Sequence, residues 1–163
     1  MKTRTLAISG IIAALYVAVS LLIAPFAFGA VQFRIAEMFN HLIVFNKKYV
    51  FGIVLGVFVT NLFSPLGLYD LTFGVAHSII TLSITIFASR YIKGYLGRMI
   101  FNTLIFTFMM FIIAFELKLA IIDIPDTFLY LWLTVAIGEF VVLAVGIPFI
   151  AALNKRLNFK AMI

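Results

Sequence analysis

The chain alternates long apolar runs with short polar connections. The apolar runs delimit six candidate helices, at residues 5–26, 35–46, 49–63, 71–91, 98–117 and 127–153. A helix needs about 20 apolar residues to cross a bilayer, so the second and third runs are short and are expected to tilt or to pack against their neighbours. The pattern therefore predicts an all-α fold, an integral membrane bundle of six transmembrane helices.

Turn-forming and charged residues mark the connections between these runs. Residues 46–48 separate the second and third helices, residues 64–70 the third and fourth, and residues 90–98 the fourth and fifth. Asp126 follows a proline ahead of the sixth helix and is its predicted N-cap. No hydrophilic linker is long enough to divide the chain, which predicts a single domain over residues 1–163.

Charge sets the expected orientation, because loops rich in Lys and Arg stay in the cytoplasm. With six crossings, Arg34 and Lys118 fall on one side of the membrane. The remaining basic residues fall on the other, namely Lys2, Arg4, Lys47, Lys48, Arg90, Lys93, Arg98, Lys155, Arg156 and Lys160. The sequence thus predicts a multi-pass protein of the cell membrane with both termini cytoplasmic.

The composition agrees with a membrane protein and excludes several other classes. Hydrophobic residues make up 65% of the chain and charged residues 11%, against roughly 45–50% and about 25% in soluble domains. The absence of cysteine excludes disulfides and thiol chemistry. The net charge of +6 does not indicate nucleic-acid binding, because the basic residues form short clusters between apolar runs. The first apolar run is longer than the core of a signal peptide, so it is expected to be retained.

Residues 31–41 concentrate polar side chains in an apolar chain, namely Gln32, Arg34, Glu37, Asn40 and His41. Such groups are costly in hydrocarbon, so their density indicates a functional site. Arg34 and Glu37 are three residues apart and can pair on one helical face, which Asn40 extends. A structural ion pair would explain Arg34 and Glu37, but it would not require Gln32, Asn40 and His41. His41 either joins the site or is satisfied by the backbone.

Later helices add polar residues that are candidates for the same site. Asn61 lies near the end of the third helix, and Asp70 either caps the fourth helix or faces the site. His77 follows two turns deeper. Glu139 lies in the middle of the sixth helix, where an unpaired carboxylate costs a few kcal/mol, so it must face a partner or a wet cavity. Trp132 is either a stacking wall for a ligand or an interfacial anchor.

Small residues follow one face of the first helix. Gly10, Ala14 and Ala18 are spaced four apart, and such strips let membrane helices approach closely. The strip serves either packing within the bundle or docking of a partner subunit.

The sequence offers no support for catalysis. The two histidines lack metal-ligand spacing, and no nucleotide-binding or nucleophile motif is present. We therefore predict no enzyme activity, no metal and no cofactor. Energy for transport against a gradient would have to come from a partner or an ion.

Residues 31–37 read VQFRIAE, residues 52–56 read GIVLG, and residues 61–70 read NLFSPLGLYD and are followed by Phe73-Gly74. These three segments resemble the QueT family. Members of this family are substrate-binding S components of energy-coupling factor (ECF) vitamin transporters, associated with queuosine precursors. The resemblance covers residues 1 to about 155. The strip of small residues is similar to the AxxxA pattern with which S components dock, with Gly10 in place of one alanine.

The resemblance implies a six-helix bundle whose ligand site opens outward, together with a transmembrane coupling subunit and two cytoplasmic ATPases. The implied cargo is 7-cyano- or 7-aminomethyl-7-deazaguanine. Its N1–H and 2-amino donors match a carboxylate such as Glu37 or Glu139. Its carbonyl oxygen matches a donor such as Asn40, Gln32 or Arg34. A cationic aminomethyl group suits Asp70 or the other of these two glutamates. The acid-rich half would also accommodate thiamine-like or polyamine cargo.

The leading hypothesis is an S component that binds a queuosine precursor. An alternative is a free-standing proton- or ion-coupled carrier of a small cationic heterocycle, with Glu139, Asp70 and His77 as a relay. A third hypothesis, an intramembrane enzyme using Glu37 with His41 or His77, has no nucleophile or metal cluster to support it.

Overall fold

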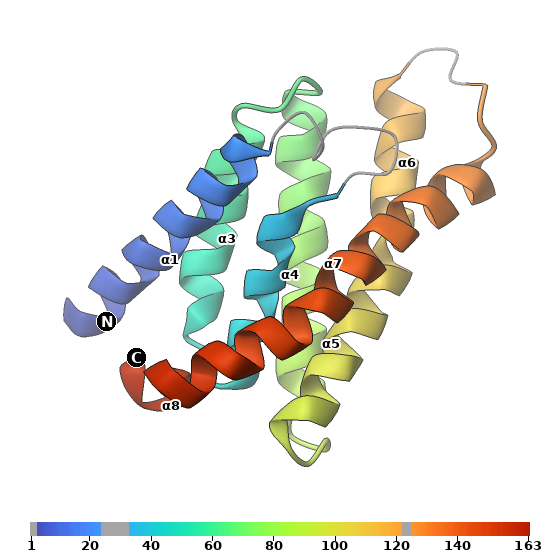
Figure 1. Cartoon of the computed structure of the whole chain (residues 1–163). Helices are drawn as coiled ribbons and strands as arrows, with labels where there is room; N and C mark the ends of the chain where they lie inside the picture. The colour runs from blue at the N-terminus through green and yellow to red at the C-terminus, as the bar shows by residue number, and fades with distance from the viewer. Residues whose placement is uncertain (1–2, 24–32, 122–124) are drawn as a thin grey trace.

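The computed structural model describes residues 3–23, 33–121 and 125–163, and the secondary structure of this part is entirely helical (Figure 1). In chain order the elements are α1 (Thr3–Leu22), η1 (Ile35–Val44), α3 (Tyr49–Asn61), η2 (Asp70–Gly74), α4 (Val75–Ala88), α5 (Tyr95–Met109), α6 (Phe111–Ala120), α7 (Phe128–Leu157) and α8 (Phe159–Met162). The all-helical fold is therefore confirmed. Gln32 lies outside the described residues.

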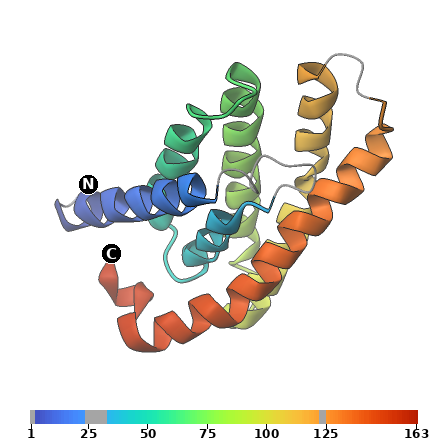
Figure 2. The same cartoon turned by 45° about the horizontal axis from the view of Figure 1, so that its top comes forward.

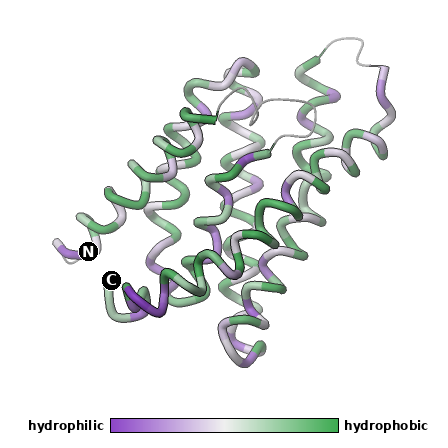
Figure 3. The backbone as a smooth tube through the Cα atoms, viewed as in Figure 1, coloured by the Kyte–Doolittle hydropathy of each residue, from purple (hydrophilic) through white to green (hydrophobic). Residues whose placement is uncertain are grey.

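Within the described residues, four stretches are long and apolar enough to cross a membrane, at Thr3–Leu22, Asp70–Ala88, Tyr95–Ala120 and Phe128–Leu157. The helices η1 and α3 are apolar but shorter, as the sequence predicts. Figure 3 shows hydrophobic residues along most of the helical path and hydrophilic ones at the chain ends and connections. A membrane crossing by η1 and α3 stays a prediction.

The helices enclose η1. Helix α1 packs along α3, and η1 contacts α1, α3, α4, α5 and α7 (Figures 1 and 2). The 30 residues of α7 span about 45 Å, and this helix runs obliquely across the bundle (Figure 1). Both termini lie at one end, where Arg4 donates to the carbonyl of Ala161 and Asn46 donates to that of Ile163.

The second helix is a 3₁₀ helix and not an α-helix. It runs over Ile35–Val44, which is long for this form. With about three residues per turn, side chains three apart lie directly above one another. Arg34, Glu37 and Asn40 therefore form one column along η1, whereas His41 belongs to the neighbouring column.

Other boundaries differ from the expected ones in detail. The fifth helix is interrupted at Met110, which separates α5 from α6, and the sixth continues past Pro148 to Leu157. The prediction that Asp126 caps the sixth helix is wrong. Thr127 is the N-cap, and its hydroxyl oxygen accepts a hydrogen bond from the backbone N–H of Tyr130.

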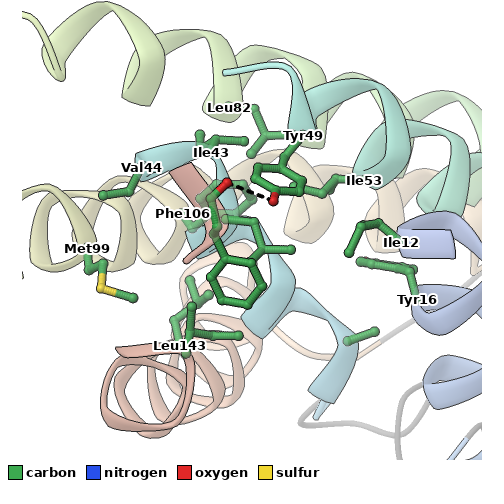
Figure 4. Close-up of a cluster of buried hydrophobic side chains, with 14 of the residues drawn as sticks. Ile12, Tyr16, Ile43, Val44, Tyr49, Ile53, Leu82, Met99, Phe106 and Leu143 are labelled. Atoms are coloured by element: carbon green, nitrogen blue, oxygen red, sulfur yellow. Dashed lines mark hydrogen bonds between the residues drawn. The ribbon is translucent and has the colours of Figure 1, made fainter. Parts of the chain in front are cut away.

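Two apolar clusters hold the bundle together. The larger one joins α1, η1, α3, α4, α5, α7 and α8, and part of it is drawn in Figure 4, where the hydroxyl of Tyr49 donates to the carbonyl of Phe159. The smaller one joins α6 to the first half of α7. Along α7, Glu139 lies between Ala136 of the smaller cluster and Leu143 of the larger.

Two glycines of α3 allow its close approach to α1. A Cβ at Gly52 would lie 2.7 Å from the backbone oxygen of Ser9, and a Cβ at Gly56 would lie 2.7 Å from the Cβ of Tyr16. Neither position has room for a side chain. The glycines of the GIVLG segment thus set the distance between the two helices.

Replacement of Gly52 by alanine is expected to destabilise the protein by about 1–3 kcal/mol, because the added methyl group meets backbone that cannot turn away. Thermal unfolding followed by circular dichroism in detergent measures the effect. Gly10→Ala is the matched control, since nothing lies within 4 Å of a Cβ there. Equal unfolding temperatures for the two variants would contradict the close approach.

Candidate functional site

The column of polar side chains on η1 is centred on Glu37. This carboxylate is fully buried and accepts hydrogen bonds from the hydroxyl of Tyr16, at 2.8 Å, and from the side-chain amide of Asn40. Arg34 Nη1 lies 3.9 Å from Glu37 Oε1, which confirms the predicted pair. That distance exceeds the roughly 2.7–2.9 Å of a charge-assisted hydrogen bond, so the guanidinium is not saturated by Glu37.

The segment between α3 and α4 closes on the other side of Arg34. Arg34 Nη2 donates to Asn61 Oδ1 at 3.3 Å, and Asn61 Nδ2 donates to the carbonyl oxygen of Asp70 at 2.8 Å. A Cβ at Gly74 would lie 2.5 Å from Asn61 Nδ2, so a side chain there would displace the Asn61 amide. The NLFSPLGLYD segment thus brings an amide and a carboxyl group to the guanidinium.

Asp70 does not cap the fourth helix. It lies in the first turn of η2, whose N-cap is Tyr69, and its carboxylate accepts a hydrogen bond from the hydroxyl of Ser64. Helix α4 begins after Gly74 and has no side-chain cap. The capping alternative for Asp70 is therefore wrong, and its carboxyl group is buried near Arg34.

Two further carboxyl groups complete the region. Glu116 of α6 and Glu139 of α7 are both fully buried. The carboxyl group of Glu116 lies against that of Asp70, whereas neither oxygen of Glu139 has a hydrogen-bond partner within the described part of the chain. Glu139 lies within electrostatic reach of Glu37 and Arg34, and Glu116 within reach of Asp70 and Arg34. Arg34 thus lies within electrostatic reach of four buried carboxyl groups. We call Arg34, Glu37, Asp70, Glu116 and Glu139 the acid cluster.

Unpartnered carboxyl oxygens are the chemically informative part of the acid cluster. A buried polar group without a hydrogen bond costs free energy, and a buried charge costs more. Asn40 Oδ1 is a further buried acceptor without a partner. The acid cluster therefore offers several acceptors to a ligand that carries hydrogen-bond donors or positive charge.

His41 is engaged by the protein through both ring nitrogens. Its Nε2 lies 2.9 Å from the carbonyl oxygen of Leu143, and its Nδ1 lies 3.3 Å from Asn102 Nδ2. These partners require the neutral tautomer in which Nε2–H donates and Nδ1 accepts. Asn102 Oδ1 in turn accepts from the hydroxyl of Thr85. These hydrogen bonds tie η1 to α4, α5 and α7. His41 is free to make them because the 3₁₀ geometry places it outside the column of Glu37.

His77 differs from His41, although both are buried. Its ring packs edge-on against Phe106, with centroids 5.4 Å apart, and neither nitrogen has a hydrogen-bond partner in the described part of the chain. Arg34 lies within electrostatic reach of it. His77 therefore borders the acid cluster with unused hydrogen-bonding capacity.

Trp132 packs in an aromatic group at the start of α7. Its Nε1–H donates to the carbonyl oxygen of Phe108 at 3.1 Å, and its ring contacts Phe108, Phe111 and Phe128. The ring is only partly buried. These contacts hold α7 to α5 and α6.

The small residues of α1 face away from the bundle. Gly10, Ala14 and Ala18 are exposed, whereas the buried face of the helix includes Ile12 and Tyr16. The alternative that the strip packs within the bundle is therefore wrong, and the outward face remains available to a partner.

Sequence reasoning missed three residues of the region, namely Tyr16, Ser64 and Glu116. Glu116 could have been found, because it interrupts an apolar helix just as Glu139 does. Tyr16 and Ser64 carry no such signal. Among the residues that the structure describes, no three His, Asp or Glu side chains are grouped so as to hold a metal ion.

Comparisons with known proteins agree with one another. Residues 6–155 match the family model described as QueT transporter. The chain is 32% identical over 168 residues to a protein of Lactococcus lactis subsp. cremoris (strain MG1363) named queuosine precursor transporter QueT, with 98% of this chain and 97% of that protein covered. No solved structure gives a significant match.

Replacement of His41 by leucine is expected to destabilise the fold by about 1–3 kcal/mol, because it strands the Asn102 amide and the Leu143 carbonyl without partners. His77→Leu is the matched control, since it removes a buried imidazole whose nitrogens have no hydrogen-bond partner among the described side chains and backbone. Thermal unfolding of both variants provides the comparison. A larger loss for His77→Leu would overturn the structural role assigned to His41.

Proposed function

Because the chain belongs to the QueT transporter family, we propose that it is the membrane S component of an ECF-type importer. In this proposal it binds a queuosine precursor, 7-cyano- or 7-aminomethyl-7-deazaguanine, from outside and releases it inward when coupled to a partner ATPase module. One observation carries the proposal, namely the fully buried carboxyl group of Glu139, which has no hydrogen-bond partner among the described residues and lies within electrostatic reach of Arg34 and Glu37.

The hydrogen-bonding edge of a deazaguanine is complementary to the acid cluster. The N1–H and 2-amino groups are parallel donors that suit the two oxygens of one carboxylate, and both oxygens of Glu139 are without a partner. The carbonyl oxygen of the base suits Arg34, which Glu37 does not saturate. Asp70 and Glu116 lie together on the other side of Arg34 and suit a cationic aminomethyl group.

The remaining proposed contacts surround this core of the site. Gln32, Asn40, Asn61 and His77 supply further polar groups to the cargo. His41 and Trp132 complete the proposed site. His41 holds η1 against α7, and the ring of Trp132 offers a stacking wall for the ligand.

Partners are proposed on two grounds. The strip Gly10, Ala14 and Ala18 faces outward, which suits docking to a transmembrane coupling subunit. The sequence has no nucleotide-binding motif, so two cytoplasmic ATPases would supply the energy.

The bundle end with both termini carries most of the Lys and Arg residues, which supports a cytoplasmic location of that end and six membrane crossings.

Glu139→Gln and Glu37→Gln are each expected to weaken cargo binding by about tenfold, because the loss of a charge-assisted hydrogen bond costs roughly 1.5–3 kcal/mol. Calorimetric titration of the purified chain with the two deazaguanines measures the effect. Asp126→Asn is the control, since it removes a carboxylate outside the acid cluster.

Unchanged affinity in both glutamate variants would refute the assigned carboxylates. Binding of another vitamin in place of both deazaguanines would refute the cargo. Uptake by cells that lack a coupling subunit, if a protonophore abolishes it, would instead favour the free-standing carrier.

Ala14→Leu and Ala18→Leu are expected to abolish co-purification with a coupling subunit while leaving cargo affinity unchanged, because the added bulk projects outward from α1. Ala152→Leu is the matched control, an equal enlargement at an exposed position of α7. Pull-down of the tagged chain from membranes that contain the coupling module gives the readout. Retention of the complex by both α1 variants would place the docking surface elsewhere.

A further inference from the structure

A hollow lies at the bundle end where both termini meet. Its volume is about 280 Å³, and it opens between the η1–α3 connection, the end of α4 and the start of α5. Its polar lining consists of Asn46, Lys47, Ser89, Arg90 and Arg98, and its apolar lining comes from η1 and α4. None of the residues that form the acid cluster contributes to it.

Three cations from separate segments converge on this hollow. Lys47 and Arg90 are exposed, whereas Arg98 is partly buried and is held in place because its Nε donates to the carbonyl oxygen of Ile92 at 2.9 Å. Arg90 lies over the ring of Phe87, 5.7 Å from its centroid. Within residues 3–23, 33–121 and 125–163, the structure gives none of the three cations a carboxylate partner.

The neutral polar groups of the hollow are already engaged. Asn46 donates to the carbonyl of Ile163 and accepts from the backbone N–H of Lys48. The hydroxyl of Ser89 donates to the carbonyl of Thr85. The donors left for a ligand are therefore the ammonium group of Lys47 and the guanidinium groups of Arg90 and Arg98, so an anion is favoured.

We propose that this hollow binds a phosphate group, carried by an anionic lipid headgroup or by a soluble phosphate. Guanidinium groups present forked donors that match the oxygens of a phosphate, and an ammonium group adds a point charge. The tendency of Lys and Arg to gather on the cytoplasmic side explains their number at this end. It does not explain why three of them surround one hollow, with Arg98 oriented by a backbone carbonyl.

A bound phosphate would connect two parts of the bundle that the chain itself does not link there. Lys47 belongs to the connection between η1 and α3, Arg90 to the connection between α4 and α5, and Arg98 to the first turn of α5. Neutralisation of the three cations would also remove their mutual repulsion. The phosphate is therefore expected to stabilise this end of the bundle independently of cargo.

The test compares two double variants of the full chain. Lys47→Gln with Arg90→Gln removes two cations of the hollow and leaves the better-packed Arg98 in place. Lys155→Gln with Arg156→Gln removes the same charge from exposed positions on α7 that do not line the hollow. Native mass spectrometry of the chain from phosphatidylcholine nanodiscs with and without phosphatidylglycerol measures bound lipid, and calorimetry with inorganic phosphate tests the soluble source.

Binding of one probe that is weakened at least about tenfold in the Lys47/Arg90 variant, and unchanged in the Lys155/Arg156 variant, is the expected result. The probe that responds identifies the source of the phosphate. No binding of either probe, or an equal loss in both double variants, would overturn the proposal, because the charge would then act as a diffuse surface field.

Discussion

The placement of the Arg34 guanidinium among buried carboxyl groups is the constraint on which the rest of the structure depends. It is the single cation of the acid cluster, where four buried carboxyl groups from η1, η2, α6 and α7 converge. Buried charges persist only when they are paired or hydrogen-bonded. Arg34 meets this requirement for Glu37 and connects it through Asn61 to Asp70, whereas Glu139 has no hydrogen-bond partner among the described residues. That imbalance distinguishes a ligand site from a structural ion pair.

The same bundle contains a polar network of the opposite kind. The Thr85–Asn102–His41 chain ends on the Leu143 carbonyl, and its hydrogen bonds fix η1 against three long helices. A fully satisfied network makes a segment rigid, and the glycines at 52 and 56 hold α1 close enough for Tyr16 to reach Glu37. The unsatisfied acceptors are therefore presented by a rigid frame, which limits the entropy lost when cargo binds.

Much of the fold followed from the hydrophobic pattern, because lipid requires helices of a set length and leaves few alternatives. The Arg34–Glu37 pair and the buried position of Glu139 followed from the cost of charge in hydrocarbon. The 3₁₀ form of η1 could not be predicted in this way, because apolar spacing over ten residues does not distinguish a 3₁₀ helix from an α-helix. For that reason the spacing of four residues from Glu37 leaves open whether His41 joins the site or is satisfied by the backbone, and the structure pairs its Nε2 with the carbonyl oxygen of Leu143. The choice of Thr127 over Asp126 as N-cap depends on one residue of helix register, which composition does not fix.

The most direct test of this account is an experimental structure of the chain with 7-aminomethyl-7-deazaguanine bound. The account predicts that the pyrimidine edge of the base lies within hydrogen-bonding distance of Glu139 or Glu37, and that the amine lies beside Asp70 and Glu116. A ligand bound elsewhere, with the carboxyl oxygens of Glu139 still without partners, would contradict it.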